Sequence, residues 1–425
     1  MAAPARELEL FEMRAMEVTE TGCADATGSL ASRPGGGLQV AGNNAAPMHI
    51  LQMIDDFRTA GTSAFICDLS AVLKARGHRV TLLTVRSQEH NEAGLIEKMK
   101  HIGVEIIDLG WTSKRAYDVV DYARAALRAR SAIKSLKPDV IHLHAYFAEQ
   151  AVNLAFPFAK LPIVITIATD TLTFDSHSWR HLFRDSLASR LYKRKSVRMV
   201  TRTHYLTARI RKRMRLGDKP VECIWNGLPR AWFLPAANGL KDIDVVVAGR
   251  ADGNKNHITI VRALAELKAR GRAVTAVIAG DGPRFEAFQS ECVKLGLTDT
   301  VSCPGQVHNI RELFDHAKIV ACPSIYEGFS RTPIEGLARG CACICSDIPS
   351  HREILDSGRY GVLLDPMDPA RWADAIAELL DNDERREALA RAGGTWVKDN
   401  FQFEPLAERY IRLYEVMKMT SKGDF

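Results

Sequence analysis

Two glutamates that lie eight residues apart, Glu327 and Glu335, form the most informative pair of side chains in this 425-residue chain. The apolar run before them, residues 318–322, predicts a buried strand, and a turn that contains Gly328 follows it. From Pro333 onward, apolar residues at helical spacing predict a helix. A helix N-terminus after a glycine turn presents free backbone N–H groups and a positive dipole end. This stretch therefore suits a ligand with an anionic centre flanked by hydroxyl groups.

A capping box explains the same residues without any ligand. Thr332, Pro333 and Glu335 have the spacing at which a threonine hydroxyl caps a helix and a glutamate reaches back to the N-cap N–H. In that interpretation Glu335 holds a helix end, and Glu327 is a solvated acid on a loop. The pattern alone favours neither interpretation, so the rest of the chain has to decide between them.

Length and composition predict about two folded domains. Hydrophobic residues make up 46% of the chain and charged residues 25%, which is typical of globular proteins. The longest apolar runs, such as residues 163–168, are far shorter than the ~20 residues that cross a bilayer, so we expect no transmembrane helix.

The nine cysteines lack the paired spacing of a zinc site. Cys341, Cys343 and Cys345 alternate along a predicted strand, which indicates small buried residues on one face rather than a metal or redox site. We therefore expect no metal. Free thiols in a chain of this size indicate a reducing, cytoplasmic location.

Charge is distributed unevenly and supports a division of the chain. Residues 1–47 carry 3 basic and 6 acidic side chains, contain a triple glycine and lack periodicity, so we expect a disordered extension. Residues 48–235 carry 30 basic and 17 acidic side chains, a net charge of +13, whereas residues 236–425 carry 24 and 28, a net charge of −4. We predict domains over 48–235 and 236–402, followed by a helical segment, 403–425, that crosses back to the first domain.

Strand-like and helix-like segments alternate from Met48 onward. Strands are predicted at residues 49–54, 79–85, 104–109, 139–143, 163–169, 244–248, 274–279, 301–303, 319–322 and 343–345. Helices are predicted at residues 62–76, 117–136, 258–270, 285–295, 372–380, 385–397 and 403–417. This alternation predicts an α/β fold with two doubly wound, Rossmann-like domains that face each other across a cleft. Ligands bind beyond the carboxyl ends of such strands, where Gly249 and Gly280 fall.

Several short motifs occur together in one order. They are Ala248-Gly-Arg250 with Lys255, Ala279-Gly-Asp-Gly-Pro283, Pro304-Gly305, Pro323-Ser324, Glu327-Gly-Phe-Ser, Glu335-Gly336, Arg339-Gly340 and Glu353. In the first half, Arg76-Gly-His78, Asp139-Val-Ile-His142 with His144, and Asn226-Gly227 belong to the same set. With these motifs the chain resembles the retaining glycosyltransferases of family four, which have the GT-B fold, over about residues 48–415. The resemblance implies a nucleoside-diphosphate-sugar donor on residues 236–402.

The expected catalytic residues are Arg250, Lys255 and Glu327. A sugar diphosphate gains negative charge as the glycosidic bond breaks, and Arg250 and Lys255 lie where two cations can stabilise it without a metal. A solvated pair at a strand end is the alternative for these two residues. The resemblance implies that Glu327 contacts the transferred sugar and that Glu335 accepts hydrogen bonds from the ribose hydroxyls, both as ionised groups.

The expected donor-binding residues surround that centre. They are Gly61, Gly249, Gly280, Gly282, Gly328, Phe329, Ser330 and Glu335. The backbone N–H groups of Gly328, Phe329 and Ser330 add to phosphate binding. Taken alone, Gly280 and Gly282 also fit a plain turn. The loop at residues 306–308 is expected near the nucleobase.

The first half departs from the family in two places. The family has two glycines after the first strand, and here Ala60 precedes Gly61. It also has a histidine in the segment that follows residue 163, which this chain lacks. Asp170 or His144 are candidates for that role, and the sequence does not choose between them.

Residues 180–215 hold 13 basic side chains and one acid, Asp185. Apolar residues interleave with them at helical spacing, which predicts a cationic amphipathic surface suited to anionic lipid headgroups. Solvated helix faces and nucleic-acid binding are the alternatives. We expect a peripheral membrane contact and no nucleic acid.

These features predict a metal-independent retaining hexosyltransferase without a cofactor, which moves a sugar to a glycan or a lipid-linked acceptor. It would be cytoplasmic, at the inner face of the membrane. Two other functions fit the same fold. One is a catalytically silent nucleotide-sugar-binding partner protein, and the other is a sugar-nucleotide epimerase, against which the glutamate pair argues.

Overall fold

The structure is a computed structural model, and it describes residues 46–58, 61–87, 91–111, 119–158, 160–169, 186, 188–235, 240–307 and 309–420. The expectation for residues 1–45 therefore lies outside the described part of the chain. Within the described residues, no helix combines the length and the apolar character that crossing a membrane requires.

The first half of the described chain forms a parallel sheet of seven strands in the order β3-β2-β1-β4-β5-β6-β7. The strands are β1 (His49–Ile54), β2 (Arg79–Arg86), β3 (Glu105–Trp111), β4 (Val140–Leu143), β5 (Ile163–Ile167), β6 (Val197–Thr201) and β7 (Val221–Cys223). Every residue of β1, β4 and β5 is buried, because helices cover both faces of a parallel sheet.

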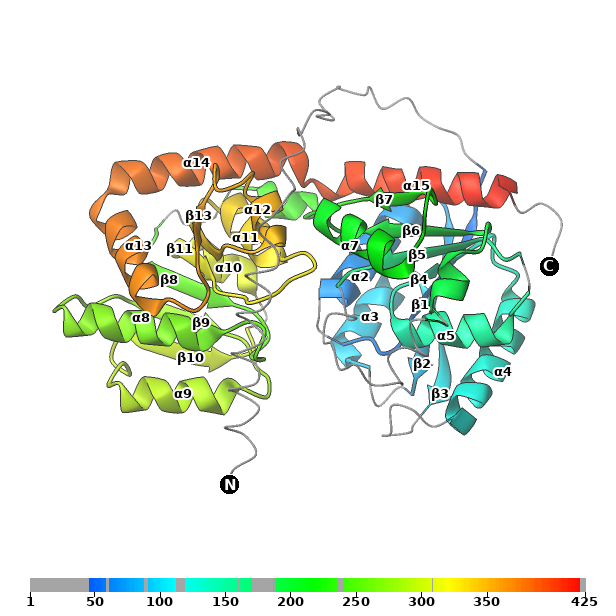
Figure 1. Cartoon of the computed structure of the whole chain (residues 1–425), viewed down its shortest axis with the longest axis horizontal. Coiled ribbons are helices and arrows are strands. Elements are labelled where there is room, and N and C mark those ends of the chain that lie inside the picture. Colours follow the sequence, from blue (N-terminus) through cyan, green and yellow to red (C-terminus); the bar gives the residue numbers. More distant parts are fainter. Residues whose placement is uncertain are drawn as a thin grey trace. The chain divides into compact units, whose positions relative to one another are not determined.

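Helices pack on both faces of this sheet (Figure 1). They are α2 (Gly61–Ala75), α3 (Ala93–His101), α4 (Val119–Leu136), α5 (Tyr146–Ala155) and α7 (His204–Met214). Strand residues alternate between the two faces. Leu51 and Met53 of β1 belong to the core cluster that includes residues of α4, α5 and α7, whereas Ile50 belongs to the cluster that includes residues of α2 and α3.

The second half forms a parallel sheet of six strands in the order β10-β9-β8-β11-β12-β13. The strands are β8 (Ile243–Ala248), β9 (Ala276–Ala279), β10 (Val301–Gly305), β11 (Ala317–Cys322), β12 (Ala342–Ser346) and β13 (Val362–Leu364). Its helices are α8 (His257–Ala269), α9 (Phe285–Lys294), α10 (Ile310–Asp315), α11 (Arg331–Ala338), α12 (Pro349–Ile354), α13 (Pro369–Asp381) and α14 (Asp383–Asn400), with the 3-10 turn η2 (Arg230–Phe233) before them. The two parallel sheets confirm the predicted α/β fold class.

In both sheets the first strand lies beside the fourth, and the chain order reverses there. β1 pairs with β2 and β4, and β8 pairs with β9 and β11. Loops at the carboxyl ends of two such neighbouring strands diverge and leave room for a ligand. In the second sheet these loops are residues 249–256 after β8 and residues 323–330 after β11.

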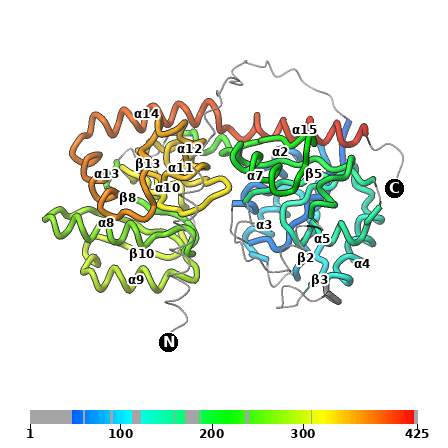
Figure 2. The backbone as a smooth tube through the Cα atoms, viewed as in Figure 1, coloured from blue at the N-terminus to red at the C-terminus, as the bar shows by residue number. Residues whose placement is uncertain are grey.

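The last helix, α15 (Phe403–Thr420), follows directly on α14 and packs on the first sheet (Figures 1 and 2). Tyr414 of α15 places its hydroxyl 2.6 Å from Nδ1 of His142 on β4. The chain passes between the sheets twice, and the two passages pair. The N–H of Leu228 donates to the carbonyl oxygen of Phe401 at 2.8 Å, and Phe403 donates back to Leu228 at 2.9 Å.

The basic stretch at residues 180–215 differs from its prediction. Helical spacing was expected around residues 182–191 and 210–214, and α7 covers the second of these. Between them Val197–Thr201 is the sheet strand β6, and Arg202 directly after it is 2% exposed. Arg180 and Arg184 lie outside the described residues. The exposed cations that remain in the described part are Arg190, Lys193, Lys195, Lys212 and Arg215.

Candidate active site

The two loops at the switch point of the second sheet are tied together by hydrogen bonds. The N–H of Ile325 donates to the carbonyl oxygen of Asn254 at 2.8 Å, and the Asn254 amide donates back to the carbonyl oxygen of Tyr326. Asn256, the residue before α8, donates from Nδ2 to the carbonyl oxygen of Pro323 at 3.2 Å. Residues 249–256 and 323–328 therefore form one connected wall.

Lys255 and Glu327 form an ion pair on this wall. Nζ of Lys255 lies 2.5 Å from Oε1 of Glu327, and Oγ of Ser324 donates to the same oxygen at 3.0 Å. Only 23% of the Lys255 side chain and 10% of the Glu327 side chain are exposed. Burial lowers the pKa of Lys255, but the carboxylate of Glu327 outweighs it, so the net pKa is raised and the ammonium keeps its charge.

Arg250 supplies a second cation at the end of β8. Its side chain is exposed and has no ion pair with any of the described residues, so it is available to an incoming anion. Gly249 before it has φ +152°, and a Cβ there would lie 3.3 Å from Cε of Lys255. Because glycine has no side chain, the Lys255 side chain can lie against the backbone of Gly249.

Gly280 and Gly282 allow the loop after β9 to lie directly on the loop after β8. A Cβ at Gly280 would fall 1.8 Å from the carbonyl oxygen of Gly249, and a Cβ at Gly282 would fall 2.5 Å from that of Ala251. Both glycines have positive φ, +146° and +156°. They therefore shape the wall through backbone packing, next to Arg250.

The capping box predicted around Glu335 is wrong. The helix α11 begins at Arg331 with Ser330 as its N-cap, and no side chain caps it. Oγ1 of Thr332 donates instead to the carbonyl oxygen of Ala248 at 3.2 Å, across to the end of β8. The Thr332 hydroxyl is thus bonded to another strand and does not cap the helix. Thr332 lies within α11, and Glu335 makes no capping bond to the helix start.

Glu335 instead pairs with Arg331, one helical turn before it. Nε of Arg331 lies 3.1 Å from Oε1 of Glu335, and Nη1 lies 3.3 Å from Oδ2 of Asp68 on α2. All three side chains are at most 13% exposed. Burial raises the pKa of Glu335, and although the charges of Arg331 and Lys255 oppose that effect, the net pKa is raised. The role expected for Glu335 requires an ionised carboxylate. Arg331 supplies a positive charge that favours this form, and the sequence did not point to that contribution.

The start of α11 leaves backbone donors for a ligand. The first N–H groups of a helix have no intrahelical acceptor, and Oγ of Ser330 is buried without a partner among the described residues. Gly328 lies against the chain after β5, where a Cβ would fall 2.1 Å from the carbonyl oxygen of Ala168. The ring of Phe329 packs 6.1 Å from that of Phe401. The structure thus brings these three predicted residues together with Glu327.

His144, one of the two candidates for the missing family histidine, lies beside His142, with ring centroids 3.9 Å apart. His142 is fully buried, with Nδ1 at 2.6 Å from the Tyr414 hydroxyl and Nε2 at 2.8 Å from Thr166, so it belongs to the core. Nε2 of His144, at the end of β4, lies 2.5 Å from Oε1 of Gln52. Burial lowers the pKa of both rings well below the usual range, so both are neutral. Asp170 lies outside the described residues.

Two other predicted positions belong to other elements. Gly61 begins α2 in the first sheet's half, and a Cβ on it would meet open space. Gln306 is exposed directly after β10, and His308 lies outside the described residues.

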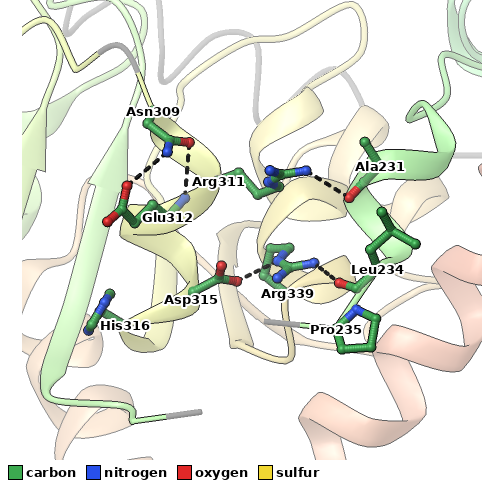
Figure 3. Close-up of a pocket in the computed structure, with 9 residues that line it drawn as sticks. All are labelled: Ala231, Leu234, Pro235, Asn309, Arg311, Glu312, Asp315, His316 and Arg339. Atoms are coloured by element: carbon green, nitrogen blue, oxygen red, sulfur yellow. Dashed lines mark hydrogen bonds and ion pairs between the residues drawn. The ribbon is translucent and has the colours of Figure 1, made fainter. Parts of the chain in front are cut away.

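A pocket of about 320 Å³ lies at the other end of α11 and is not this site (Figure 3). The guanidinium of Arg339, which lines the pocket, donates to Asp315 at 2.5 Å and to the carbonyl oxygen of Leu234. Arg311 donates to the carbonyl oxygen of Ala231 at 3.0 Å. Because these contacts attach residues 231–234 to α10 and α11, the pocket residues hold the connection between the two sheets.

Three residues that the sequence left without a role belong to the site. Arg331 and Ser324 hold the two glutamates, and Asp68 holds Arg331. The spacing of Arg331 and Glu335, four apart, is a recognisable helical ion pair once the helix start is known. Asp68 lies 263 residues away in the sequence from Arg331, and no local pattern points to it.

Two family models match adjacent parts of the chain. The one described as Glycosyltransferase Family 4 matches residues 59–232, and the one described as Glycosyl transferases group 1 matches residues 232–396. Among solved structures, Anabaena Alr3699/HepE in complex with UDP-glucose is similar with a TM-score of 0.72 and 16% identity, over 87% of this chain and 100% of its own.

Curated relatives are also glycosyltransferases by name. The N-acetylgalactosamine-N,N'-diacetylbacillosaminyl-diphospho-undecaprenol 4-alpha-N-acetylgalactosaminyltransferase of Campylobacter jejuni is 30% identical over 160 residues, which are 37% of this chain and 43% of the relative. Glycogen synthase of Mycobacterium tuberculosis is 24% identical over 383 residues, or 84% of this chain and 91% of the relative. The chain thus spans less than half of the first relative and most of the second.

The two doubly wound sheets, with Lys255, Glu327 and Glu335 gathered at the switch point of the second, define a glycosyltransferase of the GT-B fold. The chain belongs to glycosyltransferase family 4, as its sequence motifs predicted.

Proposed function

We propose that this enzyme transfers a sugar from a nucleoside diphosphate sugar with retention of the anomeric configuration and without a catalytic metal. One observation carries the proposal. Two cations, Arg250 and Lys255, lie on the same wall as Glu327, and the uncapped start of α11 ends that wall. Such a site can hold a diphosphate between positive charges and backbone N–H donors. The hydroxyl groups of the ribose and of the sugar would then lie on either side of the diphosphate.

The cations act on the leaving group. As the bond between the anomeric carbon and the phosphate oxygen breaks, that oxygen gains charge, and Lys255 and Arg250 stabilise it. The acceptor hydroxyl attacks the same face of the sugar and passes its proton to the leaving phosphate oxygen. Atoms balance without an enzymic nucleophile, so Glu327 orients the sugar hydroxyls and forms no covalent bond.

The buried carboxylate of Glu335 binds the ribose. Ribose hydroxyls donate more strongly to an ionised carboxylate than to a protonated acid. Burial outweighs the opposing charges of Arg331 and Lys255, so the net pKa of Glu335 is raised. Arg331 at 3.1 Å favours the ionised form that accepts from the ribose, and Asp68 balances the remaining charge of Arg331.

A lipid-linked acceptor is the class that two observations support. The name of the Campylobacter jejuni relative specifies a diphospho-undecaprenol acceptor. In this chain, residues 48–235 carry a net charge of +13, and exposed Lys193 and Lys195 lie beside the strand β6. Positive surfaces attract anionic lipid headgroups, so the first half is the side that would meet a cytoplasmic membrane surface.

Thermal stabilisation by a panel of nucleotide sugars tests the donor site. A donor that binds the folded enzyme raises its melting temperature, and at equal concentration a tighter donor raises it more. We expect one nucleotide sugar to stabilise the enzyme and the Lys255→Ala variant to lose that response. A panel without any stabilising nucleotide sugar contradicts the proposal. Stabilisation without turnover in the presence of acceptors indicates the silent binding protein instead.

A further inference from the structure

Three cysteine side chains from two neighbouring strands meet in the core beneath the donor loop. Cys322 ends β11, and Cys343 and Cys345 lie on β12, where Cys345 is the direct register partner of Cys322. The three Sγ atoms all lie within 4.8 Å of one another, and those of Cys343 and Cys345 are 3.4 Å apart. The residues are 5%, 0% and 0% exposed.

This spacing is the spacing of thiolates around a metal ion. A zinc–sulfur bond of about 2.3 Å in tetrahedral geometry places the sulfur atoms about 3.8 Å apart. The Sγ atoms of Cys343 and Cys345, at 3.4 Å, are slightly closer than that value, and all three Sγ atoms lie within 4.8 Å of one another. A small shift of side chains therefore completes three metal–sulfur bonds without any movement of the strands.

A fully buried histidine beside the thiols has a free ring nitrogen. His351 on α12 is 0% exposed, and its Nδ1 donates to the carbonyl oxygen of Ser346 at 3.0 Å. That bond fixes the tautomer, because a carbonyl oxygen only accepts, and it leaves a lone pair on Nε2. Nε2 has no hydrogen-bond partner among the described residues. Metal-binding histidines commonly have this arrangement, with the second nitrogen held by a backbone carbonyl.

His351 is not part of the compact thiol group, because only the three sulfur atoms lie within 4.8 Å of one another. Its ring therefore has to move toward the thiols to complete the site.

We propose that Cys322, Cys343 and Cys345 bind a soft d10 cation of the zinc class, with Nε2 of His351 as the fourth ligand. As each metal–sulfur bond forms, the thiol releases its proton to solvent. The site is structural and independent of the proposed transfer chemistry, and it holds no open position for a substrate.

From the sequence, the alternating cysteines near β12 were interpreted as plain core residues. The third thiol of the group, Cys322, comes from the neighbouring strand β11, and the sequence does not show that these strands pair. Cys341, the other cysteine of the alternating set, has a different environment. Its Sγ donates to the carbonyl oxygen of Phe314 at 3.2 Å and contacts Lys241. Cys341 is therefore a buried cysteine from the same strand region that lies outside the site, and it provides a matched control.

The site would act on the donor loop through the chain itself. Cys322 is followed directly by Pro323 and Ser324, and Ser324 donates to Glu327. A cation that fixes the end of β11 also fixes the start of this loop. We therefore expect the metal to stabilise the fold at the donor wall without any contact with substrate.

Titration of the full-length, reduced and chelator-treated protein with Cd²⁺ tests the site. Cadmium thiolates absorb in the ultraviolet, so the absorbance reports sulfur bonds, and Zn²⁺ should remove the signal by competition. We expect one equivalent of Cd²⁺ to saturate the wild type and the Cys341→Ser variant. Cys343→Ser should lose the signal, and His351→Gln should bind at least about tenfold more weakly.

Native mass spectrometry and thiol counting guard against a folding defect in these variants. In the folded wild-type protein, bound Zn²⁺ should protect three thiols from a thiol reagent, and the melting temperature should rise with Zn²⁺. Absence of a saturable cadmium signal in the wild type overturns the proposal. A signal retained by Cys343→Ser also overturns it, as does a mass that lacks two hydrogens, which would show a disulfide instead.

Discussion

Glu335 shares the guanidinium of Arg331 with Asp68, at 3.1 Å and 3.3 Å, and Glu327 shares its carboxylate between Lys255 and Ser324. Neither glutamate is a free charge in the structure. A donor therefore has to join or replace these partners, and its affinity depends on how well they hold each carboxylate in place.

Replacing Glu335 by glutamine tests the ribose contact. The Glu335→Gln change keeps the size of the side chain but removes the charge that pairs with Arg331, and a charge-assisted hydrogen bond contributes about 1.5–3 kcal/mol. We expect the dissociation constant of the donor nucleotide to rise at least about tenfold, as measured by calorimetry. The control is Glu384→Gln, an exposed change at the start of α14. Equal donor affinity in the wild type and Glu335→Gln would reduce Glu335 to a structural residue.

A buried acid in the first sheet's half predicts a pH dependence of stability. Burial raises the pKa of Glu149 from 4.5 to about 8, against the effect of the Tyr192 hydroxyl at 2.7 Å. The folded protein therefore keeps a proton that the unfolded chain has lost above about pH 5. Stability from this group is present below the unfolded pKa and falls as pH rises toward about 8, by up to about 1.4 kcal/mol per pH unit.

Glu149→Gln removes this dependence because glutamine does not titrate. We expect the loss in unfolding free energy between about pH 5 and about pH 8 to be smaller in this variant than in the wild type, by urea unfolding at each pH. Asp55, whose burial raises its pKa to about 7, still titrates in both proteins. The same slope in both proteins would show that Glu149 is ionised in the folded state.

At the scale of elements, the donor wall depends on loops that touch through their backbones. Gly280 allows the loop after β9 to contact the carbonyl oxygen of Gly249, and Gly328 allows the loop after β11 to contact that of Ala168. The position of Arg250 and Lys255 follows from this packing, because the loop after β8 lies between its neighbours. The glycines thus set the geometry of residues they do not bind.

Gly280→Ala should therefore destabilise the protein. The new Cβ would lie 1.8 Å from a backbone oxygen at a φ of +146°, so the loops must separate, at a cost of about 2 kcal/mol or more. Chemical unfolding measures this loss. Gly94→Ala on α3 is the control, since a Cβ there meets open space and has no positive φ. It should be neutral or stabilise by up to about 1 kcal/mol. Equal stabilities of the two variants would contradict this account of the wall.

Many of the strands were predictable from the sequence, because buried parallel strands are continuous apolar runs. The predicted strands at residues 49–54 and 244–248 correspond closely to β1 and β8. β6 was missed because arginine and lysine surround it, and β7 and β13 because each has only three residues. The start of α11 was misplaced because the acceptor of Thr332 is Ala248, a partner that no local pattern shows.

The motif residues of the site were predictable by type, whereas their partners were not. Arg250, Lys255 and Glu327 were named from the family motifs that they match in the sequence, and their roles stay predictions. The pairing of Arg331 with Asp68 joins α11 to α2, and it depends on the packing of elements far apart in the chain. Cys322 and Cys345 meet for the same reason, through the register of two strands.

At the scale of the whole molecule, polar contacts join the halves that carry the two sheets. Both oxygens of Glu353 on α12 accept from the N–H of His204, at 2.9 and 2.8 Å, at the start of α7. Oε1 also accepts from Nε1 of Trp225 at 2.6 Å. Glu353 was singled out only as a motif match, and the structure shows that it caps a helix of the other half.

The uneven charge of the molecule predicts binding to anionic vesicles. We expect binding at low salt that declines at high salt, because exposed charges are screened. Reversal of two exposed cations in Lys193→Glu/Lys195→Glu should weaken partitioning more than tenfold, at about 1 kcal/mol per lysine. The control is Lys294→Glu/Lys398→Glu, with equal charge change on exposed residues of the second half. Vesicle sedimentation measures both. Equal binding to neutral and anionic vesicles would refute a membrane contact of this kind.

The most direct test of the central claim is the release of nucleoside diphosphate from a stabilising nucleotide sugar, followed with and without acceptor. We expect release only when the acceptor is present, together with a glycosylated product. Lys255→Ala should slow this release by about 10²- to 10³-fold, and the exposed control Lys294→Ala should not. Release that is independent of acceptor, absent from the wild type, or unchanged in Lys255→Ala would contradict sugar transfer at the wall formed by Lys255 and Glu327.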